Sequence, residues 1–150
     1  MSLRTFVRTT EVSTSARSLF DWHEAPGAFQ RLTPPGEPVV VLAQTGGIRD
    51  GARVSVRVGW WPLAIRWDLE HVDYQAGVSF TDRQVRGPFR SWRHVHRIIP
   101  TGASTCILED RIDYELPFGP LGDLAAHLIV EPRLRRLFDY RHQVTRDAFR

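Results

Sequence analysis

Apolar and polar residues alternate along much of the first 116 positions, and this two-residue period is typical of half-buried β-strands. Breaks fall at turn residues such as Asp50-Gly51, Gly87-Pro88 and Pro100-Thr101-Gly102. Because these breaks are short, successive strands are expected to pair antiparallel. The pattern predicts seven strands, at about 3–12, 37–45, 52–60, 63–73, 77–85, 89–99 and 103–116.

Helical signals occur in two places. After the first strand, Ser13 to Ser15 can cap a short helix that reaches about His23. A second short helix, at about 25–32, must end before Pro34-Pro35. Past Pro117 the period becomes helical and predicts a long helix from about Leu121 to Phe149, which Pro132 kinks or restarts. Its apolar positions are Leu121, Leu124, Leu128, Leu134, Leu137, Phe138 and Val144.

The order of these elements predicts one α+β domain over residues 1–150. A curved seven-stranded antiparallel sheet would be covered on one face by the long C-terminal helix. If the sheet curves strongly, the helix and the sheet cannot touch everywhere. We therefore expect a cavity between them, closed at one side by the two short helices.

Composition and charge remove several classes of function. All 20 basic residues are arginine, which excludes Schiff-base chemistry through lysine. The net charge is only +3 and acidic residues interleave with the arginines, so we expect no nucleic-acid partner. No apolar run is long enough to predict stable membrane insertion, and the N-terminus lacks the pattern of a secretory signal. The lone Cys106 cannot form an internal disulfide, so a cytoplasmic location is expected. A homodimer is left open.

Alternation also assigns the two faces of the sheet. On strand 103–116, for example, Leu108 and Ile112 oppose Glu109 and Arg111. We expect the inner face to bury Trp67, Phe80, Trp92, Leu108 and Ile112. The outer face should expose Arg53, Arg57, Arg66, Glu109 and Arg111.

Several polar residues fall on the inner face, where an apolar core is expected. Buried polar groups are costly unless they bond one another, water or a ligand. These residues, together with the aromatic residues that share their face, are our candidate ligand-binding set. The set is Trp67, His71, Phe80, Asp82, Gln84, Trp92, His94, His96, Asp110 and Tyr114.

Four interpretations of this polar set are compatible with the sequence. It is a satisfied internal network, a ligand-recognition site, an acid–base site or a metal site. His94-x-His96 places two imidazoles on one face of a strand, and Asp82 or Asp110 could be a third ligand. Since His-x-His alone is a weak signal and no HExxH or cysteine cluster supports it, we expect no metal and no cofactor. No catalytic residue is assigned.

Four segments carry a resemblance to a known superfamily. They are FDWHEAPGAFQRLTPP (20–35), FTDRQVRGPFRSWRHVH (80–96), EDRIDYELPFG (109–119) and FDYRHQVTRD (138–147). The chain resembles the SRPBCC superfamily, the START and Bet v 1-like group of helix-grip domains. It is most similar to bacterial members labelled cell-division-inhibitor-like or polyketide cyclase/dehydratase-like.

The resemblance implies a helix-grip fold with a deep cavity for a lipid-, sterol- or polyketide-like molecule. We therefore expect the protein to bind or carry a small hydrophobic or amphipathic molecule. The alternative is a polyketide cyclase/dehydratase-type enzyme that uses the inward His and Asp residues for proton transfer. A third hypothesis, an interaction module, is supported only by the arginine-rich surface.

Overall fold

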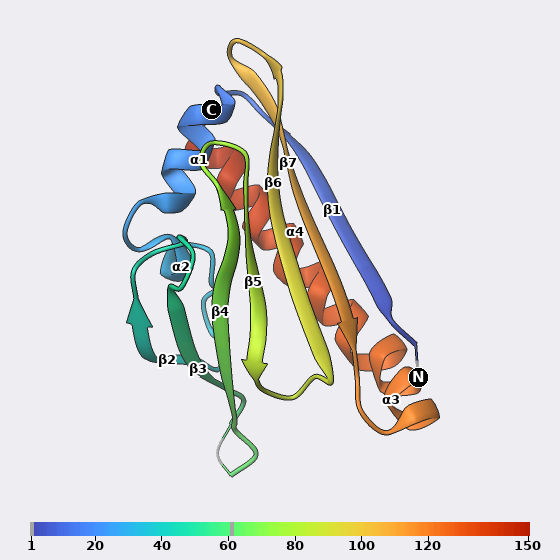
Figure 1. Ribbon diagram of the computed structural model, residues 1–150. Coiled ribbons are helices and arrows are strands. Elements are labelled where there is room, and N and C mark those ends of the chain that lie inside the picture. The colour runs from blue at the N-terminus through green and yellow to red at the C-terminus, as the bar shows by residue number, and fades with distance from the viewer. Residues whose placement is uncertain (1, 61) are drawn as a thin grey trace.

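A computed structural model describes residues 2–60 and 62–150. The strands are long in the second half of the chain and shorter around residues 39–58 (Figure 1). They are β1 (Arg4–Val12), β2 (Val39–Thr45), β3 (Arg53–Val58), β4 (Ile65–Gln75), β5 (Ser79–Arg86), β6 (Ser91–Gly102) and β7 (Thr105–Glu115).

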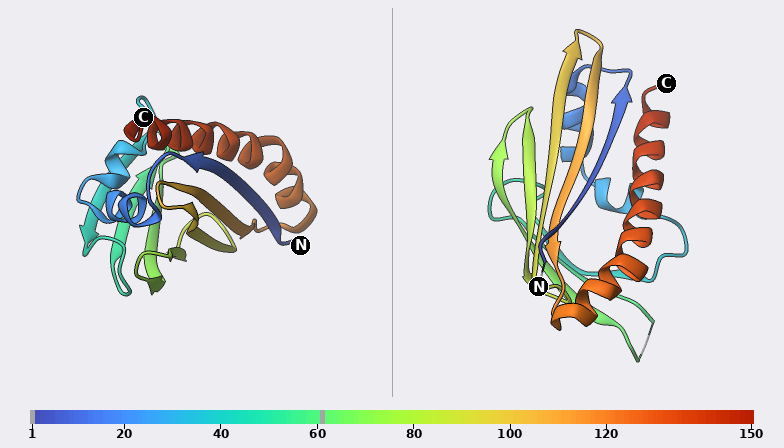
Figure 2. Two further views of the ribbon diagram at one scale, coloured as in Figure 1. Left: turned by 90° about the horizontal axis from the view of Figure 1, so that it is seen from above. Right: turned by 90° about the vertical axis from the view of Figure 1, so that its right-hand side faces the viewer.

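The seven strands form one antiparallel sheet in the order β1-β7-β6-β5-β4-β3-β2. Each strand from β2 to β7 pairs with its neighbour in sequence, and β1 pairs with β7. The sheet curves strongly, so that its two ends rise around the long helix (Figure 2). The predicted α+β class and curved antiparallel sheet are confirmed, whereas β1 pairs with β7 and not with β2, the next strand in sequence.

Two short helices join β1 to β2. Helix α1 (Ala16–Glu24) is capped by the side-chain hydroxyl of Ser15, which accepts a hydrogen bond from the backbone N–H of Ser18. Helix α2 (Ala28–Arg31) is a single turn that begins after Gly27 and ends before the two prolines. The two helices lie at one end of the concave side of the sheet (Figure 1).

The C-terminal helix is continuous but bent. It consists of α3 (Gly119–Ala125), a π-helical segment η1 (Ala126–Val130) and α4 (Glu131–Ala148). Pro132 lacks the N–H that an α-helix requires, and its ring crowds the carbonyl one turn earlier. The wider turn of η1 lies directly before this proline, and α3 swings away from the axis of α4 (Figure 2).

This bend changes which apolar positions of the helix are buried. Leu121, Leu124 and Leu128 belong to the apolar period that predicted the helix, but each is more than half exposed. The π turn shifts the helical phase, so only the apolar positions beyond it continue onto the sheet. Leu134 and Phe138, which follow the proline, are buried.

The buried residues form two clusters. The larger one lies between the sheet and α4 and includes Val56, Trp92, Ile112 and Phe138. The smaller one lies under α1 and includes Phe20, Phe80, Ile98 and Leu108.

The predicted faces are correct for most positions. Phe80, Trp92, Leu108 and Ile112 are buried, and Trp67 is partly buried. On the outer face Arg53, Arg57, Arg66 and Arg111 are exposed, whereas Glu109 is half-buried. Within residues 2–60 and 62–150, no helix combines the length and the hydropathy needed to cross a membrane.

Candidate functional site

Three neighbouring strands bring the inward polar residues together. Asp82 on β5 lies opposite His94 on β6, and His96 lies opposite Asp110 on β7. Because residues two apart on a strand share a face, the two carboxylates and two imidazoles form a compact cluster on the concave side. The long antiparallel register of β6 with its neighbours fixes their positions.

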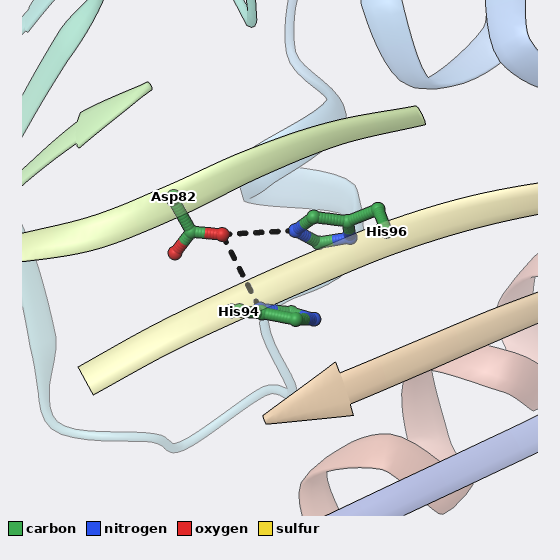
Figure 3. Close-up of side chains that lie close together, drawn as sticks. All are labelled: Asp82, His94 and His96. Atoms are coloured by element: carbon green, nitrogen blue, oxygen red, sulfur yellow. Dashed lines mark hydrogen bonds and ion pairs between the residues drawn. The ribbon is translucent and has the colours of Figure 1, made fainter. Parts of the chain in front are cut away.

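The cluster is held by short polar contacts. His94 Nε2 and His96 Nδ1 lie 2.8 Å and 2.9 Å from the same oxygen, Oδ1 of Asp110. His96 Nε2 lies 3.0 Å from Asp82 Oδ1, and His94 Nδ1 lies 3.3 Å from that atom (Figure 3). The second oxygen of Asp110 contacts His142 Nε2 at 2.6 Å.

Burial and charge shift the pKa values of these groups in opposite directions. Burial alone would raise the pKa of Asp82, but the nearby imidazoles, His94 first, lower it far below its usual range. The same competition lowers the pKa of Asp110, mainly through its hydrogen bond with His142. Both carboxylates are therefore ionised at neutral pH.

The two histidines differ from each other. Burial, reinforced by the charge of His96, lowers the pKa of His94. Burial would also lower the pKa of His96, but its contacts with Asp110 and Asp82 outweigh that effect and raise the pKa to about 9. The cluster thus favours one imidazolium over two adjacent ones.

The cluster forms part of the wall of a large cavity between the sheet, α2 and α4. The cavity has a volume of about 810 Å³. Its wall is mostly apolar, which is typical of sites for hydrophobic ligands. The apolar wall includes Phe29, Leu32, Val54, Val56, Val58, Trp67, Leu69, Phe80, Phe89, Trp92, Leu134, Leu137 and Phe138.

Seven of the ten candidate residues lie in this wall. They are Trp67, His71, Phe80, Asp82, Trp92, His94 and His96. The remaining three, Gln84, Asp110 and Tyr114, do not line the cavity. Asp110 lies behind the two histidines, and Tyr114 is packed in the larger core cluster.

Gln84 does not join the network that the sequence predicted for it. Its side-chain amide donates to the backbone carbonyl of Phe89 at 2.7 Å, and its carbonyl accepts from the backbone N–H of Phe89. These bonds close the turn between β5 and β6. Alternation placed Gln84 on the correct face, but it could not show that the adjacent turn would use the amide.

Two residues of α4 were not assigned to the site from the sequence. His142 is buried against Asp110, and Arg141 lines the cavity. Leu134, Phe138 and His142 are spaced four residues apart and therefore share one face of the helix. This spacing could have predicted that His142 faces the sheet. Arg141 lies beside that face and carried no comparable signal.

Arg141 is a half-buried cation in the cavity wall. Its Nε donates to the backbone carbonyl of Leu32 at 3.1 Å, and its guanidinium carbon lies 5.3 Å from the centre of the Phe138 ring. No ion pair joins it to a carboxylate within residues 2–60 and 62–150. Burial lowers the pKa of Arg141, and the more distant charges of Asp110 and Asp82 oppose that shift.

Three other wall residues hold polar atoms that lack partners. Trp67 Nε1, Trp92 Nε1 and His71 Nδ1 are buried without a hydrogen bond to any part of the chain that the structure describes. The two indoles pack edge to face, with ring centres 4.9 Å apart. The wall therefore has unused hydrogen-bonding capacity next to its aromatic surface.

Solved structures share this architecture over nearly the whole chain. The aromatase/cyclase Zhui from Streptomyces sp. R1128 superposes with a TM-score of 0.73 at 16% identity, covering 98% of this chain and 93% of its own. A START superfamily protein from Mycobacterium smegmatis gives 0.69 at 16%, covering 96% and 98%. Truncated norcoclaurine synthase from Thalictrum flavum gives 0.71 at 16%, covering 95% and 93%.

No family model and no curated protein sequence matches the chain. The structural likenesses nevertheless agree with each other and with the observed element order. The chain has the helix-grip fold that the resemblance of the four sequence segments implied. At 16% identity the likeness shows the fold alone.

Proposed function

We propose that the protein binds or carries a small amphipathic molecule in the cavity. The observation that carries this proposal is the mostly apolar cavity of about 810 Å³, which leaves a large volume between sheet and helix without protein side chains. Protein interiors are normally close-packed, so an unfilled apolar volume of this size lowers stability unless a ligand occupies it. Lipid-, sterol- and polyketide-like molecules have suitable size and polarity.

The polar groups indicate how such a ligand is oriented. Arg141 projects from α4, whereas Asp82, His94 and His96 project from the sheet. A ligand with an apolar, partly aromatic body would pack against Trp67 and Trp92. Its acidic or carbonyl oxygens would then accept hydrogen bonds from the guanidinium of Arg141.

Cavity filling tests this function. We expect 8-anilinonaphthalene-1-sulfonate, an aromatic anion whose fluorescence rises in apolar sites, to bind the wild-type protein. Leu137 is partly buried in the cavity wall, so Leu137→Trp should occupy ligand volume and weaken binding about 10-fold or more.

The matched control is Leu128→Trp, which makes the same change at an exposed position of the same helix outside the cavity wall. This control should bind the dye like wild type. Equal affinity of wild type and Leu137→Trp, with both proteins folded by circular dichroism, would place the dye on the surface and contradict the proposal.

A polyketide cyclase or dehydratase is the second candidate function. It is favoured by the position of His94 and His96 in the wall beside ionised carboxylates, where they could transfer protons to a bound substrate. Turnover of a poly-β-ketone analogue that is lost in His96→Gln, with dye binding retained, would support the enzyme. Tight binding without turnover would favour the carrier.

Two further expectations stay part of this proposal. We propose that residues 1–150 act as a single ligand-binding domain and that the protein operates in the cytoplasm. We also propose that the partner of the protein is a hydrophobic or amphipathic small molecule and not a nucleic acid.

A further inference from the structure

The arrangement of Asp82, His94 and His96 has the dimensions of a metal-binding triad. Asp82 Oδ1 lies 3.3 Å from His94 Nδ1 and 3.0 Å from His96 Nε2, and the three atoms all lie within 4.8 Å of one another (Figure 3). Ligand atoms that bind one transition metal at about 2.1 Å are separated from each other by roughly 3.0 to 3.4 Å. Both separations from Asp82 Oδ1 fall in that interval.

The opposite edges of the same two imidazoles are fixed as they are in metal sites. His94 Nε2 and His96 Nδ1 both contact Asp110 Oδ1, at 2.8 Å and 2.9 Å. Metal-binding histidines usually donate their second ring N–H to a carboxylate, which sets the tautomer and the ring orientation. Asp110 provides this support for both rings and is itself held by His142 at 2.6 Å.

The charges around the two rings also suit a cation. Two carboxylates, Asp82 and Asp110, contact the two imidazoles, whose ring centres lie 3.7 Å apart in a buried site. One divalent cation between Asp82 and the two rings would balance both carboxylates and bind the ring nitrogens that face Asp82, while the ring nitrogens that face Asp110 stay hydrogen-bonded to it.

The triad is also accessible from the cavity. Asp82, His94 and His96 line it, whereas Asp110 and His142 lie behind them. Coordination positions that the protein does not fill would therefore face the ligand volume.

We propose that Asp82 Oδ1, His94 Nδ1 and His96 Nε2 bind one divalent transition-metal ion, with Asp110 as the carboxylate that positions both imidazoles. Two imidazoles and one carboxylate suit Zn²⁺, Fe²⁺ or Co²⁺ and disfavour Mg²⁺ and Ca²⁺. This inference departs from the sequence-based expectation of no metal, because sequence spacing could not show that both rings meet Asp82 and Asp110. It does not depend on the identity of the organic ligand.

Equilibrium dialysis with Zn²⁺ and titration with Co²⁺ test the site in the intact protein. We expect one Zn²⁺ per chain and visible Co²⁺ absorption bands that report nitrogen and oxygen ligation. Asp82→Asn keeps the side-chain size and should weaken Zn²⁺ binding about 100-fold or more. Asp110→Asn should weaken it about 10- to 100-fold through the loss of positioning.

Two controls separate this site from other metal binding. His127 and Glu131 form an exposed pair at 3.9 Å, so His127→Ala removes a weak surface site and should leave the stoichiometry at one. Glu24→Gln changes a carboxylate of the cavity wall that contacts Tyr74 rather than the triad, and should leave Zn²⁺ affinity within about 3-fold. The inference is overturned if wild type binds no stoichiometric Zn²⁺ or Co²⁺, or if binding disappears in His127→Ala. The wild-type measurement decides this even if a buried variant fails to fold.

Discussion

Individual buried charges in this protein are tolerated because they compensate one another. Each carboxylate of the cluster contacts at least two imidazoles, and each imidazole of β6 contacts both carboxylates. Removal of one member takes a partner from the buried groups that contact it, and breaking a buried ion pair in this way commonly costs several kcal/mol. This interdependence makes conservative substitutions more informative here than truncation to alanine.

His23 is the clearest source of pH-dependent stability outside the cluster. It is buried in α1 with Nδ1 2.9 Å from the carbonyl of Leu19, and burial lowers its pKa to about 4. The charges of His96 and His142 lower this pKa further, while the hydrogen bond to Leu19 and the charge of Asp110 oppose the shift. The unfolded chain, with a pKa near 6.5, therefore binds a proton before the folded chain does.

The stabilisation by neutral His23 is complete above pH 6.5 and is lost as the pH falls toward 4. Between pH 7 and pH 5 we expect His23 to account for a loss of about 2 kcal/mol in the free energy of unfolding. Urea unfolding of wild type and His23→Gln at both pH values checks this. A His23→Gln protein that loses as much stability as wild type would assign the pH dependence to other groups.

Arg141 is expected to determine the preference for anionic ligands. Arg141→Met keeps an unbranched side chain that resembles the aliphatic part of arginine, and removes the charge. The affinity for 2-naphthoic acid should fall about 10- to 100-fold, which is the usual contribution of a charge-assisted hydrogen bond. The affinity for methyl 2-naphthoate should change little. Isothermal titration calorimetry measures both ligands. The exposed Arg136→Met serves as a control, and equal losses for acid and ester in Arg141→Met would show a packing role only.

The alternation of apolar and polar residues predicted most of the polar cluster on the sheet, but not the residues that α4 adds to the site. The shared face of Asp82, His94, His96 and Asp110 follows from strand geometry and from short turns between successive strands. The contributions of His142 and Arg141 depend on the rotation of α4 about its own axis. That rotation is set by packing and by the π turn, which local sequence patterns do not encode.

Among the elements, α3 begins where the backbone of Gly122 passes close to the backbone of Pro117. A Cβ atom at Gly122 would lie 2.0 Å from the backbone oxygen of Pro117. Alanine normally stabilises a helix interior by about 1 kcal/mol relative to glycine. Here we expect Gly122→Ala to destabilise the protein by roughly 1–3 kcal/mol because the backbone must move.

The control for this substitution is Gly102→Ala. Its Cβ would meet only the side-chain hydroxyl of Thr105, at 2.8 Å, and that group can rotate away. Chemical denaturation should show a loss below about 1 kcal/mol for this control. A stabilised Gly122→Ala protein would show that α3 does not rest against residue 117 in solution.

The type and order of the elements were predicted well, because alternation, turn residues and helical spacing are local signals. Strand ends differ from the structure by up to three residues, as for β6, which extends through Pro100 to Gly102. Leu121 and Leu124 of α3 belong to the apolar period that predicted the long helix, but they are exposed, because the period changes before Pro132. The structure interrupts that period with η1.

For the whole molecule, the cavity divides what would otherwise be one continuous core. The smaller cluster under α1 is packed, whereas the larger cluster surrounds the open volume between sheet and α4. A ligand that binds only the folded state raises the free energy of unfolding by mass action. At ligand concentrations above Kd, this increase grows with the logarithm of the ligand concentration. If the proposed ligand binds in the cavity, the ligand-free protein should therefore be the less stable form.

The cavity has two walls with different tolerance to sequence change. The sheet wall carries the cluster of interdependent charges, in which a change at one position affects several partners. The facing wall comes from one contiguous helix, on which Leu134, Leu137 and Arg141 contact the volume without sharing that network. Chains that descend from a common ancestor could thus acquire new ligands by changing a few neighbouring codons of α4, while β5, β6 and β7 keep their polar residues.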